Sequence, residues 1–162
     1  MAVDFAGKQR ERGGEGWALR NIKLRMSRKL IFATGLLMCF SCYTQLPVMA
    51  DGTEKSSDIL IQHVSSFVED PPLEILANAL LQYSIPAKTV FELLDSYDLF
   101  LEYLNDVQHR DDLENLSYED SISDTVFQQM REVGQQFQRG LDRLFFQDND
   151  ELKRLIRQYG IF

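Results

Sequence analysis

The residues best suited to chemistry in this chain are two histidines and two cysteines, set among 25 carboxylates. Asp106 and His109 stand one helical turn apart, the spacing at which an acid and an imidazole share a metal ion in carboxylate-bridged dimetal bundles. Such a site needs a second pair of the same kind, but Leu60 stands three residues before His63. We therefore predict no metal site, and we interpret His109 as a cation near the C terminus of a helix.

No other residue pattern indicates catalysis. The chain has no glycine loop that would cradle a phosphate and no serine elbow with partner residues. Asp148, Asp150 and Glu151 lack the spaced oxygens and the glycine of a calcium loop. We therefore predict a protein that is not an enzyme, with no catalytic residues and no cofactor.

Residues 26–50 have the three-part layout of a secretory signal peptide. A short basic region is followed by the apolar run 30–42 and then by a more polar stretch that ends in small side chains. Pro47 interrupts the helix, and Val48 and Ala50 offer small side chains at the −3 and −1 positions of a cleavage site. The pattern predicts cleavage after Ala50 and a periplasmic or secreted protein.

Two alternatives remain for the same segment. Cys42 follows Ser41, as the lipidated cysteine of bacterial lipoproteins follows a small residue. The segment also resembles an uncleaved membrane anchor, although a span takes about 20 apolar residues and this apolar run is shorter. In both cases the protein touches the membrane only through its N-terminal segment, and the helical domain lies outside the cytoplasm.

Residues 1–25 show little apolar periodicity and a mixture of charges. Such a composition favours disorder. A signal peptide normally begins at the initiator methionine, so translation from Met26 with a mis-assigned start is the second interpretation of this segment.

The charge is divided unevenly along the chain. Residues 1–50 carry eight Lys and Arg against three Asp and Glu, a net of +5, and the whole chain carries −8, so residues 51–162 carry −13. A domain this acidic is repelled by the phosphates of nucleic acids. We therefore expect no nucleic-acid partner and favour a protein partner with basic surface charge.

The 3.6-residue apolar period dominates after residue 57 and predicts an all-α fold, a small four- or five-helix bundle after an N-terminal export signal. Residues 51–57 are expected to form a flexible lead-in and residues 58–162 the helical domain. Expected helices cover about 58–69, 71–84, 86–109 (with 90 as the alternative start), 117–146 (with 121 as the alternative start) and 148–160.

The expected helix over 86–109 has an apolar stripe opposite an acidic one. The apolar stripe comprises Val90, Leu94, Tyr97, Leu101 and Leu104, and the acidic one Glu92, Asp95, Asp98, Glu102 and Asp106. Thr89 and Glu92 have the spacing of a capping box. We interpret the acidic stripe as a solvated face, because like charges at this spacing point away from a common ion.

The expected helix ending near Phe146 has a longer stripe, made of Val126, Phe127, Met130, Val133, Phe137, Leu141, Leu144 and Phe145. Gly134 and Gly140 lie at its edges and each lowers helix stability by about 1 kcal/mol relative to Ala. Their positions predict close approach of a neighbouring helix.

Four apolar residues fall outside the expected core stripes: Phe91, Leu99, Phe146 and Phe162. Single exposed apolar residues are common, but a group of them ringed by acids is typical of a partner surface. We predict an exported, non-catalytic protein that binds a protein partner, with a lipid-tethered or membrane-anchored envelope subunit as the alternative.

Overall fold

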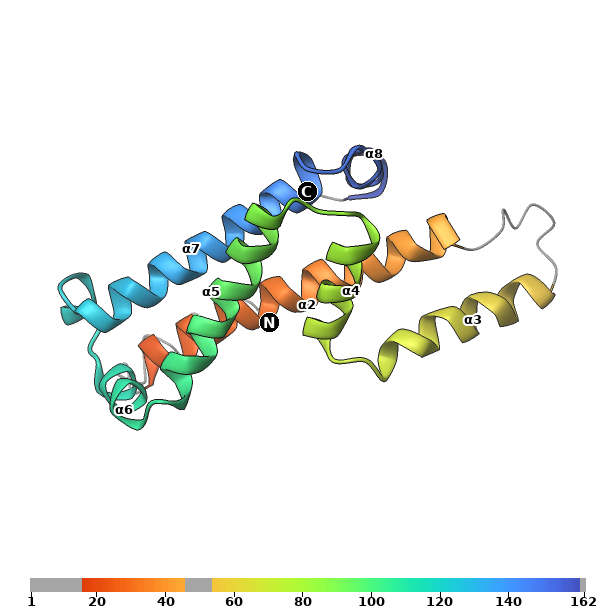
Figure 1. Cartoon of the computed structure of the whole chain (residues 1–162). Coiled ribbons are helices and arrows are strands. Elements are labelled where there is room, and N and C mark those ends of the chain that lie inside the picture. Colours follow the sequence, from red (N-terminus) through yellow and green to blue (C-terminus); the bar gives the residue numbers. More distant parts are fainter. Residues whose placement is uncertain (1–15, 46–53, 161–162) are drawn as a thin grey trace. The chain divides into compact units, whose positions relative to one another are not determined.

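The computed structural model describes residues 16–45 and 54–160, and every regular element in these ranges is helical. The predicted all-α class is therefore confirmed (Figure 1). The α-helices are α2 (Trp17–Gln45), α3 (Glu54–Val68), α4 (Pro72–Gln82), α5 (Ala87–Asn105), α6 (Val107–Asn115), α7 (Thr125–Phe146) and α8 (Asp150–Tyr159), and a short 3-10 helix, η1, covers Asp120–Ile122.

The expected number of four or five helices is wrong, because the described residues form seven α-helices. One additional helix is α2, and another arises where the expected 86–109 helix divides at Asp106. The backbone of Asp106 is extended (φ −72°, ψ 119°), and its carboxylate accepts the backbone N–H of His109 at 2.8 Å. Aspartate is a strong N-cap, so the residue starts a new helix, α6, in place of continuing α5.

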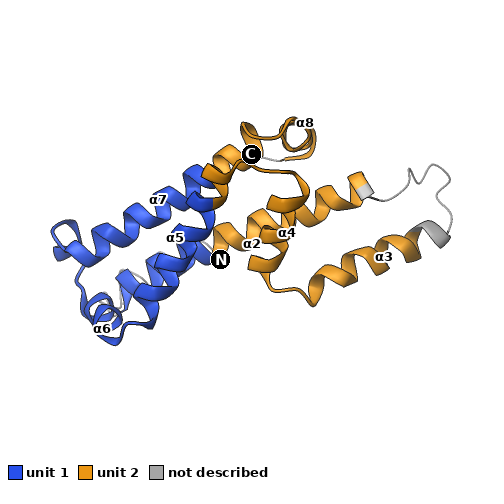
Figure 2. Ribbon diagram, viewed as in Figure 1, with its two compact units in different colours: residues 1–27, 91–140 blue, residues 28–90, 141–162 orange. Residues whose placement is uncertain are grey.

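The helices belong to two units (Figure 2). Unit 1 comprises residues 1–27 and 91–140, and unit 2 comprises residues 28–90 and 141–162. The boundaries fall inside α2, α5 and α7, so each of these helices contributes one part to each unit.

Unit 1 packs the start of α2 against the elements around α7. The Gly16 N–H donates to the Glu114 carbonyl at 2.7 Å, and the Trp17 ring lies 5.1 Å from Tyr118 and 5.2 Å from Phe127 between ring centroids. The fully buried side chains of this unit include Met26, Leu93, Leu113, Met130 and Phe137.

Unit 2 is built around residues 28–45 of α2. Phe40 meets Phe145 of α7 edge to face with centroids 6.4 Å apart. Leu76, Leu144, Leu152, Leu155 and Ile156 are among its fully buried side chains.

Residues 17–25, which the sequence analysis assigns to a disordered or mis-assigned segment, form the first turns of α2. Along the whole helix one face is buried. After the adjacent pair Ala18 and Leu19, its members follow at intervals of three or four residues: Ile22, Met26, Leu30, Ala33, Leu37 and Phe40. This spacing places them on one stripe of an α-helix, the arrangement of a core-facing helix.

The helix α3 begins at Glu54 and therefore takes in part of the expected 51–57 lead-in. Of its apolar side chains, Leu60 and Val68 are exposed, whereas Val64 and Phe67 are half-buried. By contrast, α8 matches its predicted range, buries Leu152, Leu155 and Ile156, and ends at Gly160.

The expected capping box of Thr89 and Glu92 is replaced by a tertiary contact in unit 2. Thr89 is buried inside α5, and its hydroxyl donates to the Asp148 carboxylate at 2.5 Å. The adjacent Asn149 caps α8, its side-chain oxygen accepting the N–H groups of Glu151 and Leu152 at 3.0 Å each. Asp148 is thus engaged by Thr89, and the next residue takes over the cap.

Candidate functional site

A groove of about 460 Å³ lies between α5 and α7 in unit 1. From α5 it is lined by Leu99 and Tyr103, and from α7 by Gln128, Gln129, Arg131, Glu132, Val133 and Gln135. Three of the α7 side chains are amides, which both donate and accept hydrogen bonds. The groove thus combines an apolar floor with groups able to pair with peptide backbone.

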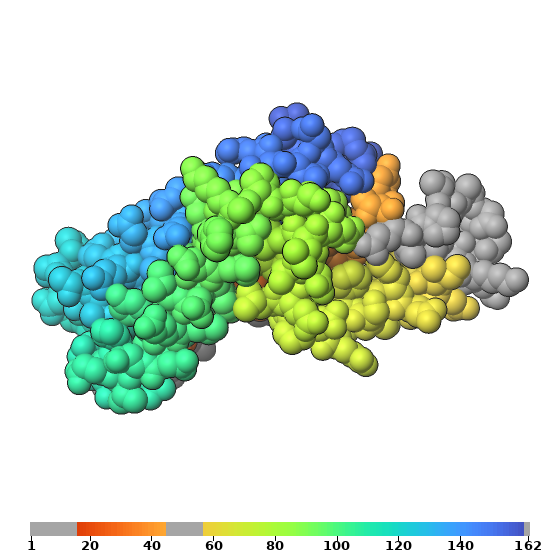
Figure 3. All heavy atoms as spheres, viewed as in Figure 1, coloured from red at the N-terminus to blue at the C-terminus, as the bar shows by residue number. Residues whose placement is uncertain are grey.

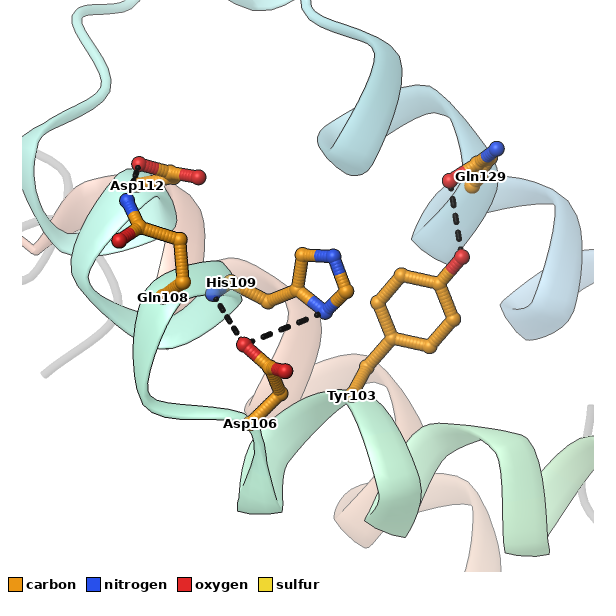
Figure 4. A network of polar contacts seen from close by, with 6 residues as sticks. All are labelled: Tyr103, Asp106, Gln108, His109, Asp112 and Gln129. Carbon is orange, nitrogen blue, oxygen red and sulfur yellow. Dashed lines mark hydrogen bonds and ion pairs between the residues drawn. The ribbon is translucent and has the colours of Figure 1, made fainter.

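Tyr103 belongs to a group of polar side chains near the end of α5 (Figure 4). Its hydroxyl donates to Gln129 Oε1 at 2.8 Å, and its ring stacks on the His109 imidazole with centroids 4.7 Å apart and planes at 22°. These two contacts hold the Tyr103 ring between α6 and α7 and fix one wall of the groove.

The Asp106–His109 pair has a structural role in this arrangement. Asp106 Oδ1 accepts the His109 N–H as the cap of α6, and the same oxygen lies 3.6 Å from His109 Nδ1 (Figure 4). That second separation exceeds hydrogen-bond length for the buried Nδ1. The prediction that His109 lies near the C terminus of a helix is wrong, because His109 lies in the first, N-terminal turn of α6.

No group of three or more His, Cys, Asp or Glu within residues 16–45 and 54–160 is arranged to hold a metal ion. His63 lies in unit 2, where its Nε2 is 2.9 Å from the Ser41 hydroxyl and its ring meets Phe67 edge to face. Each histidine thus has its own local partners within its unit.

The α5 face that lines the core differs from the predicted one. Leu93, Ser96 and Phe100 are buried, whereas Leu101 is 40% exposed. The shift by one residue turns the buried face by about 100° around the helix axis. It leaves Asp95, Asp98 and Glu102 exposed, as the sequence predicts for the acidic stripe.

Three of the four residues predicted to form a partner surface lie in the part of the chain that the structure describes. Phe91 is 69% exposed on α5, and Leu99, eight residues further along, lines the groove. Phe146 is 42% exposed and belongs to unit 2, while Phe162 lies outside the described residues. Leu99 thus connects the predicted surface with the groove, while the surface as a group of four stays a prediction.

The groove residues Tyr103 and Gln129 are absent from the sequence-based candidates. A signal was present, since Tyr103 follows Leu99 by one helical turn and therefore lies on the same face of α5. Gln129 carries no comparable signal, because glutamine is common on solvated helix faces.

The residues that decide export and lipidation are described only in part. The predicted cleavage position at Ala50 lies outside the described residues, whereas Cys42 is half-buried in α2. Burial raises the pKa of the Cys42 thiol, and the neighbouring Cys39 raises it further. None of the described helices is both long and apolar enough to span a bilayer.

Comparison with protein-family models, curated proteins and solved structures finds no match to the chain.

Proposed function

We propose that this protein is exported, is cleaved after Ala50, and acts without catalysis by binding a protein partner. The signal-peptide layout of residues 26–50 supports export. The charge of −13 on residues 51–162 supports a partner with basic surface charge.

The observation that carries the binding role is the groove between α5 and α7. Leu99 and Val133 supply apolar surface, while Tyr103 and the α7 amides supply hydrogen-bonding groups. A peptide segment needs both, because its side chains bury apolar area and its backbone groups need partners. The exposed acids Asp95, Asp98 and Glu102 on the same helix α5 favour a basic segment.

The binding role is tested with a full-length protein that carries a photo-crosslinker at Gln135, in cells of the native host. We expect a discrete crosslinked adduct that Leu99→Arg abolishes, because the substitution puts a cation on the apolar floor. Leu101→Arg is the matched control on an exposed position of the same helix. Equal adducts from both variants, or none from the parent, would refute the groove as the binding site.

Export is tested separately by mass spectrometry of the N terminus in the native host. A mature chain that starts at Asp51 supports the proposal. An acylated Cys42, or a chain that retains residues 26–50, supports the alternative of an envelope subunit attached to the membrane. Peptides that contain Trp17 would exclude translation from Met26.

A further inference from the structure

The part of α2 in unit 2 buries a narrow apolar stripe. Leu30, Ala33, Leu37 and Phe40 follow one another at intervals of three and four residues, and each is at most 4% exposed. This spacing is that of a helix lying in an apolar groove formed by its neighbours.

The neighbours fit this stripe closely. Leu37 and Ser41 border a residual cavity of only about 30 Å³ together with Phe67 of α3 and Ile75, Ala79 and Tyr83 around α4. On α7, Phe145 contacts Phe40. The groove that holds α2 is therefore lined by apolar side chains of α3, α4 and α7.

Polar and aromatic contacts fix the register at the end of α2. The Ser41 hydroxyl lies 2.9 Å from His63 Nε2. The Tyr43 ring lies 5.6 Å from Tyr159 of α8 and 5.3 Å below the Arg154 guanidinium. The orange end of α2 is visible beside α8 in the space-filling view (Figure 3).

The part of α2 in unit 2 and the rest of that unit have net charges of opposite sign. Within unit 2, residues 28–45 contain Arg28 and Lys29 and no Asp or Glu, whereas residues 51–90 and 141–162 together contain ten acidic and six basic side chains, a net charge of −4. A basic helix on an acidic domain is favoured by electrostatic complementarity and is guided to it by long-range attraction.

When cleavage after Ala50 precedes folding, this helix is absent from the folded chain, and the apolar side chains that it covers here are exposed. A large contiguous apolar surface of that kind is characteristic of an interaction site. We propose that unit 2 then accepts, in the place of α2, a basic amphipathic helix from its protein partner. The partner helix presents aliphatic side chains and one aromatic at three- and four-residue intervals, followed by a hydroxyl that faces His63. This inference rests on the proposed export and cleavage.

The experiment uses the full chain with a site-specific protease sequence inserted between α2 and α3, within residues 46–53. The protein is folded first and then cut, and native mass spectrometry follows the two pieces. They are unfolded in urea and refolded with an excess of a fluorescent synthetic peptide of residues 17–45. We expect the cut chain to stay associated and the labelled peptide to replace the original helix in a one-to-one complex.

Two variant peptides define the binding face. A peptide with Leu37→Asp and Phe40→Asp changes two buried positions, and we expect its affinity to fall by at least about 100-fold. A peptide with Ile31→Asp and Cys39→Asp changes two exposed positions and has the same added charge, and we expect its affinity to fall less than about tenfold.

Loss of association on cutting, aggregation on refolding without capture of the peptide, or equal affinities of the two variants would each overturn the inference. An adduct insensitive to Leu99→Arg would refute the proposed function alone, whereas a native N terminus other than Asp51 would refute both the proposed function and this inference. The two failures are therefore distinguishable.

Discussion

The helices α5 and α7 face each other in unit 1, and their sequences predict their buried faces with different success. In α7 the residues Phe127, Met130, Val133, Phe137, Leu141, Leu144 and Phe145 are buried as predicted, and Val126 alone of that stripe is half-buried. In α5 the buried face lies one residue away from the predicted stripe. The difference teaches that an apolar pattern fixes a helix face only when the other faces are polar.

The composition of the two helices explains this outcome. The faces of α7 outside its stripe are rich in glutamine and arginine, so a single orientation buries apolar area efficiently. In α5 apolar residues occur on several faces, and Phe91 and Leu101 remain exposed. The orientation of α5 is set by its close contact with α7, because Gly140 of α7 leaves room for the Leu93 side chain of α5.

The test with the largest expected effect compares alanine substitutions of a buried and an exposed leucine of α5. Leu93→Ala removes a side chain that is 0% exposed, and we expect the free energy of unfolding to fall by about 2–5 kcal/mol. Leu101→Ala, on the sequence-predicted stripe, is expected to cost less than about 1 kcal/mol because the side chain is already partly hydrated. Urea denaturation measures both, and a larger loss for Leu101→Ala would restore the predicted face.

The second test concerns the two glycines of α7. A Cβ atom at Gly140 would lie 2.7 Å from Leu93 Cγ and 2.8 Å from Leu93 Cδ2, so Gly140→Ala forces the buried leucine to move. We expect a loss of about 1–3 kcal/mol from this overpacking.

Gly134→Ala is the matched control for that substitution. Its Cβ would lie 3.9 Å from Met26 Sδ, which is ordinary contact distance. We expect unchanged stability or a gain of up to about 1 kcal/mol from helix propensity. Thermal unfolding of the two variants side by side decides the point, and equal effects would show that α5 and α7 are further apart.

A smaller effect is expected at Ser96, the polar member of the buried α5 face. Its hydroxyl donates to the Glu92 carbonyl at 2.5 Å, with the Leu93 carbonyl at 3.0 Å, so it is satisfied within its own helix. Ser96→Ala should therefore change stability by less than about 1 kcal/mol. Ser96→Leu should cost about 1–3 kcal/mol if that face is tightly packed. Denaturant titration checks both, and a tolerated leucine would contradict the observed face.

The smallest effect is confined to alkaline pH and involves Tyr97, whose ring contacts Phe137 of α7 at 5.8 Å between centroids. Burial raises the pKa of Tyr97 above its ordinary value, so the folded state holds this proton more tightly than the unfolded state. The resulting stability is complete below the unfolded pKa of about 10 and is lost as the pH rises through the folded pKa.

Tyr97→Phe should therefore leave stability near neutral pH almost unchanged and should flatten its decline above about pH 10. Part of the decline remains in this variant, because burial also raises the pKa of Tyr83 in unit 2. Stability curves at several alkaline pH values measure the difference. An unchanged slope would show that the Tyr97 hydroxyl is hydrated in the folded protein.

The all-helical class, the range of α8 and the face of α7 could be predicted because each depends on local pattern. The division at Asp106 could not, since the same residue also fits the acidic stripe of a continuous helix. Thr89 was likewise expected to cap its own helix, whereas its hydroxyl donates to Asp148, 59 residues further along the sequence. Contacts between residues so far apart in the sequence cannot be predicted from the apolar periodicity of a single helix.

The candidate groove was predictable at one residue. Leu99 departs from the expected stripe and is therefore a sequence-based candidate, whereas Tyr103 and Gln129 acquire their roles only through each other. The role of α2 depends on the same kind of information, since its apolar residues satisfy the pattern of an export signal and that of a core helix alike. The sequence pattern of that segment therefore does not distinguish an export signal from a core helix.

Cys39 and Cys42 both lie in α2, so a thiol-specific reagent modifies this helix and no other part of the chain. These are the only thiols of the chain, and Cys39 is exposed while Cys42 is half-buried. A maleimide reagent should add twice to a polypeptide that keeps this helix, first at Cys39, and should leave a polypeptide that starts at Asp51 unmodified. Counting added mass thus reports the processing history of each molecule in a mixture, with no antibody and no known binding partner.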